Sequence, residues 1–283
     1  MIDGKQVYFE FFGQYPQKVR DERDGWLRLF DGHREGWADK ADFLLSRDAT
    51  AYFTDRINAD PKDIFAWGSR GIAWKDRGEF DNAIKDYTEW IRLDPNSADA
   101  FINRGNAHRA KKEYDSATRD YTEAIRLDPK CVIAYHNRSV ARLLLRQPES
   151  ADGFRTVLDL EGGKGENSPF AVIRGHLAAR LNGDAEEAKR FLTERAAKLG
   201  KDWPYPVVEY LRGDIAEAAL LKLATDDDKR AGARCYLGFD LLIKGKTNEA
   251  AAHFRWVNEH GKHDFTEYTI AVAELDRMEK AKK

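Results

Sequence analysis

The most regular feature of the chain is a pattern of apolar and polar positions that repeats every 34 residues. Asp-Pro pairs begin at Asp60, Asp94 and Asp128, and each pair is followed by two stretches whose apolar positions recur with helical spacing. A proline cannot continue a helix and disfavours the helical conformation in the residue before it, so each pair ends one helical unit. The pattern predicts helix pairs over 62–95 and 96–129, and a third pair from 130 to 161.

Small and aromatic residues occupy fixed places within each unit. Gly71 and Gly105 lie on the first helix, while Ala83 and Ala117 lie on the second, where small side chains let two antiparallel helices approach closely. Aromatic residues such as Trp67 are expected to fill the space between neighbouring pairs. One helix pair cannot bury its apolar face alone, so the units are expected to stack into an array.

These positions resemble the tetratricopeptide repeat (TPR). The matching residues are Trp67, Gly71, Trp74, Phe80, Ala83, Tyr87 and Pro95, followed by Phe101, Gly105, Tyr114, Ala117, Tyr121, Ala124 and Pro129. The resemblance implies a mainly α fold, a right-handed TPR solenoid of about six helix pairs with a capping helix. It also implies structural ion pairs between helices, Arg70 with Asp86 and Arg104 with Asp120.

The period becomes irregular after Glu161 but persists. The glycine-rich stretch 160–168 lacks the spacing of a phosphate-binding loop and is expected to connect two parts of the array. Turn glycines followed by small residues recur at Gly183, Gly213 and Gly245, which predicts three divergent repeats over 169–261. An amphipathic helix over 265–280 is expected to cap the array and to complete the segment 169–283.

The divergent half also resembles the C-terminal part of NlpI-type bacterial TPR lipoproteins. The residues that carry this resemblance are Trp203 to Glu209, Gly213, Leu220 to Asp226, Tyr236 to Gly238, Gly245, Phe265 to Tyr268, Ala271, Glu274 and Leu275. It implies an adaptor for envelope enzymes that has no chemistry of its own. The chain departs from these lipoproteins because it shows no lipid-attachment cysteine near its start.

Residues 1–45 have a different pattern. The β-prone stretches 7–12 and 26–30, with a turn expected at Asp31-Gly32, predict a small β unit. The run from Trp26 to Leu29, followed by Gly36-Trp37, resembles the later strands of a bacterial SH3-like domain. Residues 46–61 are predicted to form a half-repeat helix between this unit and the array.

Composition and charge narrow the possible functions. The chain has 283 residues, 42% of them hydrophobic, and a net charge of −2, and no apolar stretch approaches the length of a membrane span. A nearly neutral chain carries no overall field that would attract nucleic acid or an anionic membrane. The N-terminus lacks the features of a signal peptide, so the protein is expected to be cytoplasmic as written, or extracytoplasmic if a signal has been removed.

The sequence contains no catalytic or metal-binding motif. No nucleophile-elbow, zinc-peptidase or dinucleotide-binding motif occurs, so the protein is expected to be neither an enzyme nor a cofactor carrier. His260 and His263 lack further ligands at metal-binding spacing and are expected to be surface residues. The run Asp226 to Asp228 lacks the interleaved pattern of a calcium loop and is expected to be a solvated turn.

The remaining function for such an array is binding, because the first helices of stacked pairs line an inner groove. By repeat position, Phe65, Gly68, Ile72 and Lys75 are expected to line this groove in the first repeat. The residues expected to contact a peptide or partner protein are Lys75, Asn103, Asn106, Arg109, His136 and Asn137. Side-chain amides would bind peptide backbone groups, and the cations would bind a carboxylate. Two alternatives remain open: a peptidoglycan-associated adaptor that acts through the SH3-like unit, and nucleic-acid binding by the basic strip 101–112, which contains no acidic residue.

Overall fold

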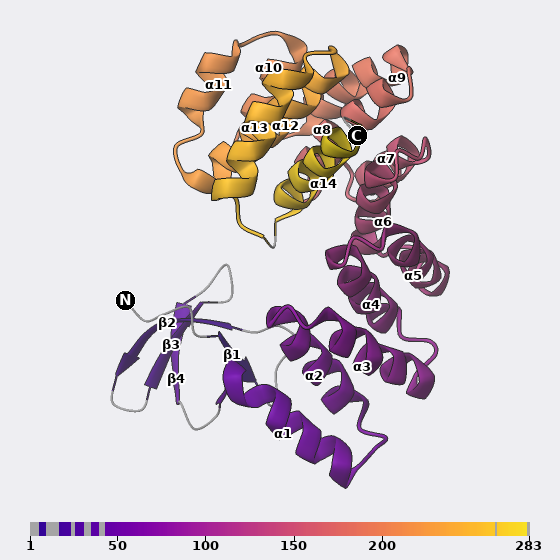
Figure 1. The fold of residues 1–283 in the computed structure, drawn as a ribbon, viewed down its shortest axis with the longest axis vertical. Helices are drawn as coiled ribbons and strands as arrows, with labels where there is room; N and C mark the ends of the chain where they lie inside the picture. Colours follow the sequence, from indigo (N-terminus) through magenta and orange to yellow (C-terminus); the bar gives the residue numbers. More distant parts are fainter. Residues whose placement is uncertain are drawn as a thin grey trace. The chain divides into compact units, whose positions relative to one another are not determined.

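The structure is a computed structural model that describes residues 6–9, 17–23, 26–30, 35–39, 43–263 and 265–281. The chain divides into two compact units, unit 1 (residues 1–112) and unit 2 (residues 113–283). The described residues are mainly α-helical (Figure 1). None of the described helices is both long enough and apolar enough to cross a membrane.

Unit 1 begins with a five-stranded sheet. Its strands are β1 (Gln6–Phe9), β2 (Gln17–Arg23), β3 (Trp26–Phe30), β4 (Glu35–Asp39) and β5 (Phe43–Leu45). They pair antiparallel in the order β4-β3-β2-β1-β5, so the first four form a meander and β5 returns beside β1. The turn expected at Asp31-Gly32 lies outside the described residues, and the resemblance to an SH3-like domain stays a prediction.

Four helices complete unit 1. They are α1 (Ser46–Ala59), α2 (Ile64–Asp76), α3 (Phe80–Leu93) and α4 (Ala98–Ala110). Asp63 and Ser97 precede α2 and α4, and their side chains accept hydrogen bonds from the amides of Ala66 and Ala100, respectively. Gly78, with φ of 76°, allows the tight turn between α2 and α3. The turn predicted between 75 and 80 is therefore confirmed.

The helices of unit 1 pack through the residue types that the repeat pattern singled out. Tyr87 of α3 is fully buried, and a Cβ atom on Gly71 of α2 would lie 2.6 Å from its Cε1 atom. Only glycine therefore lets α2 and α3 approach this closely. The predicted ion pair of unit 1 is also present, because Arg70 donates through Nε and Nη2 to the two carboxylate oxygens of buried Asp86, each at 2.8 Å.

Unit 2 contains ten α-helices among its described residues. They are α5 (Tyr114–Leu127), α6 (Val132–Leu144), α7 (Ser150–Leu160), α8 (Ser168–Leu181), α9 (Ala185–Arg190), α10 (Tyr205–Arg212), α11 (Glu217–Leu223), α12 (Asp227–Ile243), α13 (Thr247–His260) and α14 (Thr266–Lys280). A short π-helix, Phe191–Arg195, continues α9. One apolar core extends from Val140 to Ala273 and includes residues of α6 to α14. Ala117 and Tyr121 of α5 form a smaller cluster with Ala141 of α6.

The turn glycines expected in the divergent half lie at helix ends. Gly183, Gly213 and Gly245 all have positive φ, and α8, α10 and α12 end within two residues of them. The predicted Arg104–Asp120 pair would join unit 1 to unit 2 and stays a prediction. The division of the chain at Lys112 falls within the second repeat, whereas the sequence pattern changes near residue 161.

Candidate partner-binding surface

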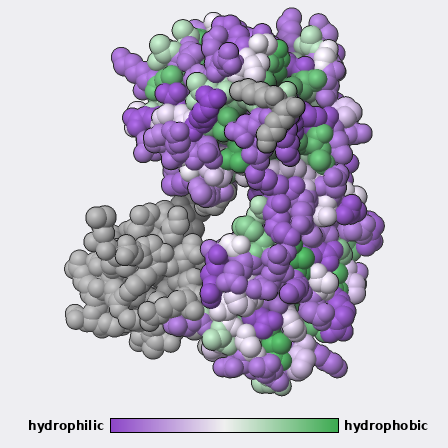
Figure 2. Space-filling model, viewed as in Figure 1, coloured by the Kyte–Doolittle hydropathy of each residue, from purple (hydrophilic) through white to green (hydrophobic). Residues whose placement is uncertain are grey.

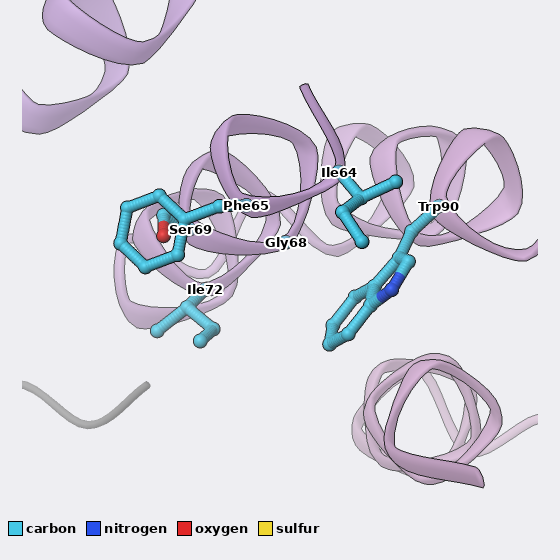
Figure 3. A pocket seen from close by; sticks show the side chains of 6 residues that line it. All are labelled: Ile64, Phe65, Gly68, Ser69, Ile72 and Trp90. Atoms are coloured by element: carbon cyan, nitrogen blue, oxygen red, sulfur yellow. The ribbon is translucent and has the colours of Figure 1, made fainter. Parts of the chain in front are cut away.

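The first helix of the first complete repeat, α2, carries an apolar hollow. Its lining residues are Ile64, Phe65, Gly68, Ser69 and Ile72 of α2, together with Trp90 of α3. The hollow has a volume of about 150 Å³, and Figure 3 shows the apolar side chains of α2 and the indole ring around it. Apolar cavities of about this volume admit a benzene-sized group.

An exchange of large and small residues builds the hollow. Trp90 is 7% exposed, and a Cβ atom on Gly68 would lie 2.9 Å from its Cζ3 atom, so the indole ring occupies the space of a missing side chain. In the next repeat, 34 residues later, the corresponding residues are Ile102 and Ala124. The first repeat therefore has a small residue on its first helix and a large one on its second, the reverse of the next repeat.

The rim of the hollow reaches solvent. Ile64 is 41% exposed, although it is a large apolar side chain. Figure 2 shows a mostly hydrophilic face in which hydrophobic residues form small separate groups. Singly exposed apolar residues are ordinary, but Ile64 also lines the hollow, so the hollow opens to solvent at this residue.

The four predicted site residues of unit 1 lie on α2 and α4. The Lys75 ammonium is 3.4 Å from Asp76, and its side chain is 35% exposed. Asn103 donates through Nδ2 to the backbone oxygen of Asp99, at 2.9 Å, and Asn106 is half-buried. The Nε atom of Arg109 is buried without a hydrogen-bond acceptor among the described residues. Because α4 packs against α2, these side chains belong to one helical layer of unit 1.

The two predicted site residues of unit 2 lie on α6. Asn137 is half-buried, whereas His136 is only 9% exposed and lies with its Nε2 atom 2.7 Å from Nη1 of Arg174 on α8. Arg174 also donates through Nη2 to the carboxylate of Glu267 on α14, at 2.5 Å. His136 thus faces a buried polar cluster inside unit 2.

The C-terminal helix α14 closes this cluster. Tyr236 of α12 donates to the same oxygen of Glu267 at 2.5 Å, and Arg146, just after α6, donates to buried Glu274 at 2.5 Å. Burial raises the pKa of Glu267, but the charge of Arg174 and the hydrogen bond from Tyr236 outweigh it, so the pKa lies below its ordinary value. The last helix, α14, therefore bridges the first helices α8 and α12 and the end of α6.

The other candidate groups have structural roles. Asp226 accepts a hydrogen bond from the amide of Lys229 and so caps α12. The ring of His260 stacks on Trp256, and the ring of His263 stacks on Tyr268. Among the residues that the structure describes, no three His, Cys, Asp or Glu side chains are grouped so that they could hold a metal ion.

The comparisons with known proteins match the repeat pattern. The tetratricopeptide repeat family matches residues 98–131, and a second TPR repeat family matches residues 73–111. Neither match reaches the sheet or the C-terminal half, so the SH3-like and NlpI-like resemblances stay predictions.

Solved structures show the same fold. A MamA crystal structure is 19% identical over 62% of this chain and 94% of its own, with a TM-score of 0.50. A tetratricopeptide repeat protein from Parabacteroides merdae ATCC 43184 is 16% identical over 83% of this chain and 93% of its own, with a TM-score of 0.55. At such identities the likeness extends to the fold alone. The chain therefore contains tetratricopeptide repeats and folds as a mainly α, TPR-like solenoid.

Proposed function

We propose that the protein is a non-enzymatic scaffold that holds a partner protein by binding an extended segment of it along α2 and α4 of unit 1. Tetratricopeptide repeats support protein interaction in general. The observation that carries the proposal is the apolar hollow on α2, which lies in the same helical layer as the polar residues of α4. A site with one apolar hollow and a few polar groups is typical of peptide recognition.

The polar residues supply the complementary groups. The side-chain amides of Asn103 and Asn106 can bind the backbone N–H and C=O groups of an extended peptide, which do not depend on its sequence. Arg109 can place its guanidinium against a carboxylate, where a charge-assisted hydrogen bond is stronger than a neutral one. Unit 2 supports binding of this kind less well, because His136 is buried and its first helices are bridged by α14.

The basic strip 101–112 does not favour nucleic acid. Lys111 pairs with Asp81 at 2.7 Å, and Arg104 donates to Thr88 and lies over the ring of Phe101. Cations that bind a nucleic-acid backbone must instead be available to phosphates.

The peptidoglycan alternative remains a prediction from the sequence. It requires that the full chain co-sediment with peptidoglycan and that this co-sedimentation be lost when residues 1–45 are deleted.

The experiment that tests the proposal is selection of binding peptides. A displayed library of random peptides is panned against the full chain, and the affinity of the enriched peptides is then measured by fluorescence polarisation. The change Asn106→Ala with Arg109→Ala should weaken binding at least about tenfold, as loss of a hydrogen bond to a charged group implies, without lowering the melting temperature.

A matched control removes one side-chain amide and one cation from the second helix. Asn82 and Lys85 lie on α3, and Lys85 is exposed. The change Asn82→Ala with Lys85→Ala should leave peptide affinity within about twofold, because a difference that small lies well below one hydrogen bond. If the α3 change weakens binding as much as the α4 change, or if no peptide is enriched, the proposed function is wrong.

A further inference from the structure

We propose that Arg138 and Arg142, on the side of α6 that faces α5, form a binding site for a doubly charged oxoanion such as a phosphate group. The two residues are four positions apart, so they lie on one face of the helix. Arg138 donates through Nη1 to the hydroxyl of Thr122 on α5, at 3.3 Å, which directs this face toward the second helix of the preceding repeat. The site lies within unit 2 and uses none of the residues proposed to bind a peptide in unit 1.

The repeat pattern shows which partner Arg138 has lost. In the first repeat, Arg70 donates to Thr54 of the preceding helix and, through Nε and Nη2, to the carboxylate of Asp86, 16 residues later. Arg138 keeps the bond to a threonine, but the residue 16 positions after it is Phe154, which is fully buried. The Nε atom of Arg138 is buried without a hydrogen-bond acceptor among the described residues. The guanidinium therefore lacks the counter-charge that the first repeat supplies.

A second arginine adds to this excess of positive charge. Arg142 makes no hydrogen bond or ion pair within the described part of the chain, and its Nε atom is also buried without an acceptor. Burial and the nearby charge of Arg142 lower the pKa of Arg138, and no described carboxylate offsets this repulsion. Arg138 lies over the ring of Tyr135, 5.4 Å from its centroid, so its guanidinium is held in place although it is repelled.

The chemistry of these groups favours an oxoanion with two charges. A guanidinium binds an oxoanion through two parallel N–H bonds, and two guanidiniums match the charge of a dianion. Both side chains are only half-buried, so their terminal nitrogens can reach such a ligand. Thr118 lies four residues before Thr122, on the same face of α5, and its buried hydroxyl has no hydrogen-bond partner among the described residues. One bound dianion replaces the repulsion between Arg138 and Arg142 by two attractive contacts.

The test measures binding of inorganic phosphate to the full chain by isothermal titration calorimetry. Constant ionic strength and a pH of about 8, where a phosphate group is mostly dianionic, keep screening and ligand charge fixed. The wild-type chain should bind one phosphate with a Kd of about 1 mM or lower. Arg142→Gln should weaken binding at least about tenfold, because one charge-assisted contact is lost.

The matched control removes an arginine charge elsewhere in unit 2. Arg119 on α5 is exposed and donates to Ser116 at 3.0 Å, with no carboxylate partner among the described residues. Arg119→Gln should leave the phosphate affinity within about twofold, because exposed charges interact weakly with distant groups in salt.

Melting temperatures distinguish a binding role from a structural one. Without phosphate, Arg142→Gln should melt at the wild-type temperature or above it, because the substitution removes a like-charge repulsion. Phosphate at ten times its Kd should raise the wild-type melting temperature by about 3 °C. The same addition should not change the melting temperature of Arg142→Gln.

Each outcome supports or overturns the site. Loss of binding in Arg142→Gln but not in Arg119→Gln supports it. Glycerol phosphate that binds as tightly as inorganic phosphate would identify a phosphate monoester as the source, and weaker binding would identify free phosphate; both agree with the site. Acetate that binds as tightly as phosphate, equal weakening in the two variants, or a lower melting temperature of Arg142→Gln without phosphate would overturn it.

Discussion

At the scale of residues, one contact recurs through both units. A glycine on a first helix faces an aromatic ring 16 residues later on the following helix: Gly71 with Tyr87, Gly175 with Phe191, and Gly238 with Phe254. A Cβ atom on these glycines would lie 2.6, 2.2 and 2.7 Å from the ring, respectively. The contact therefore explains why the repeat persists in the divergent half, where most other positions of the pattern are lost.

This contact predicts opposite effects of the same substitution at two helical glycines. Gly71→Ala should lower the free energy of unfolding by about 1–3 kcal/mol, because the added methyl group collides with Tyr87. Gly232→Ala in α12 should raise it by about 0.5–1 kcal/mol, because alanine favours the helix. At Gly232 the nearest atom to the new Cβ is Cζ2 of Trp203, at an ordinary contact distance of 3.4 Å. Urea unfolding measures the free energy of unfolding of both variants. A Gly71→Ala chain more stable than the wild-type chain would refute the close packing of Gly71 against Tyr87.

Repeat position predicts that Phe65, Gly68 and Ile72 line the groove, but it does not predict that they form an apolar hollow with Trp90. Gly68 and Trp90 each depart from the residue 34 positions later, which is visible in the sequence. Neither departure has meaning alone, since a glycine can mark flexibility and a tryptophan can simply be buried. Only the 2.9 Å separation from the missing Cβ atom shows that the two departures compensate each other.

At the scale of elements, the last helix determines how unit 2 is held together. Helix α14 packs against α12 and α13, which precede it, and also against α6, more than one hundred residues earlier. Local periodicity predicts that residues 265–280 form an amphipathic helix, and this is confirmed by α14. It cannot predict the partner on its buried face, because the contact with α6 depends on how the intervening helices turn in space.

Removing the charge of Glu267 should release this helix. Glu267→Gln leaves Arg174 without its buried carboxylate, and breaking a buried pair in this way costs about 3–5 kcal/mol. Glu279→Gln, at an exposed position of the same helix, should change the free energy of unfolding by less than about 0.5 kcal/mol. Thermal unfolding of the two variants gives the comparison, and equal melting temperatures would contradict a structural role for the cluster.

The same pair has a defined pH dependence. The pKa of Glu267 in the folded chain lies below its ordinary value of 4.5, so the unfolded chain binds this proton more tightly. Its contribution to stability is therefore complete above about pH 4.5 and is lost as the pH falls below that value. The Glu267→Gln chain should lack this part of the acid dependence, so its stability deficit relative to the wild-type chain should shrink on acidification.

At the scale of the whole molecule, the two units differ in what their first helices contact. In unit 2, α6, α8 and α12 are joined through the Arg174 and Glu267 cluster to α14. In unit 1, α2 instead carries an apolar hollow that residues of α2 and α3 line. The repeat spacing assigns equivalent positions to every first helix, so it predicts the same binding role for His136 and Asn106. In the structure His136 is buried, whereas Asn106 is half-buried.

The most direct test of the account is hydrogen–deuterium exchange of the full chain with and without a selected peptide. Peptide binding should slow amide exchange in 64–76 and 98–110, because these helices form the proposed contact surface. Exchange in α6, α8 and α14 should not change. Slowed exchange in these helices of unit 2, with none in α2 and α4, would show that the partner binds elsewhere and would contradict the central claim.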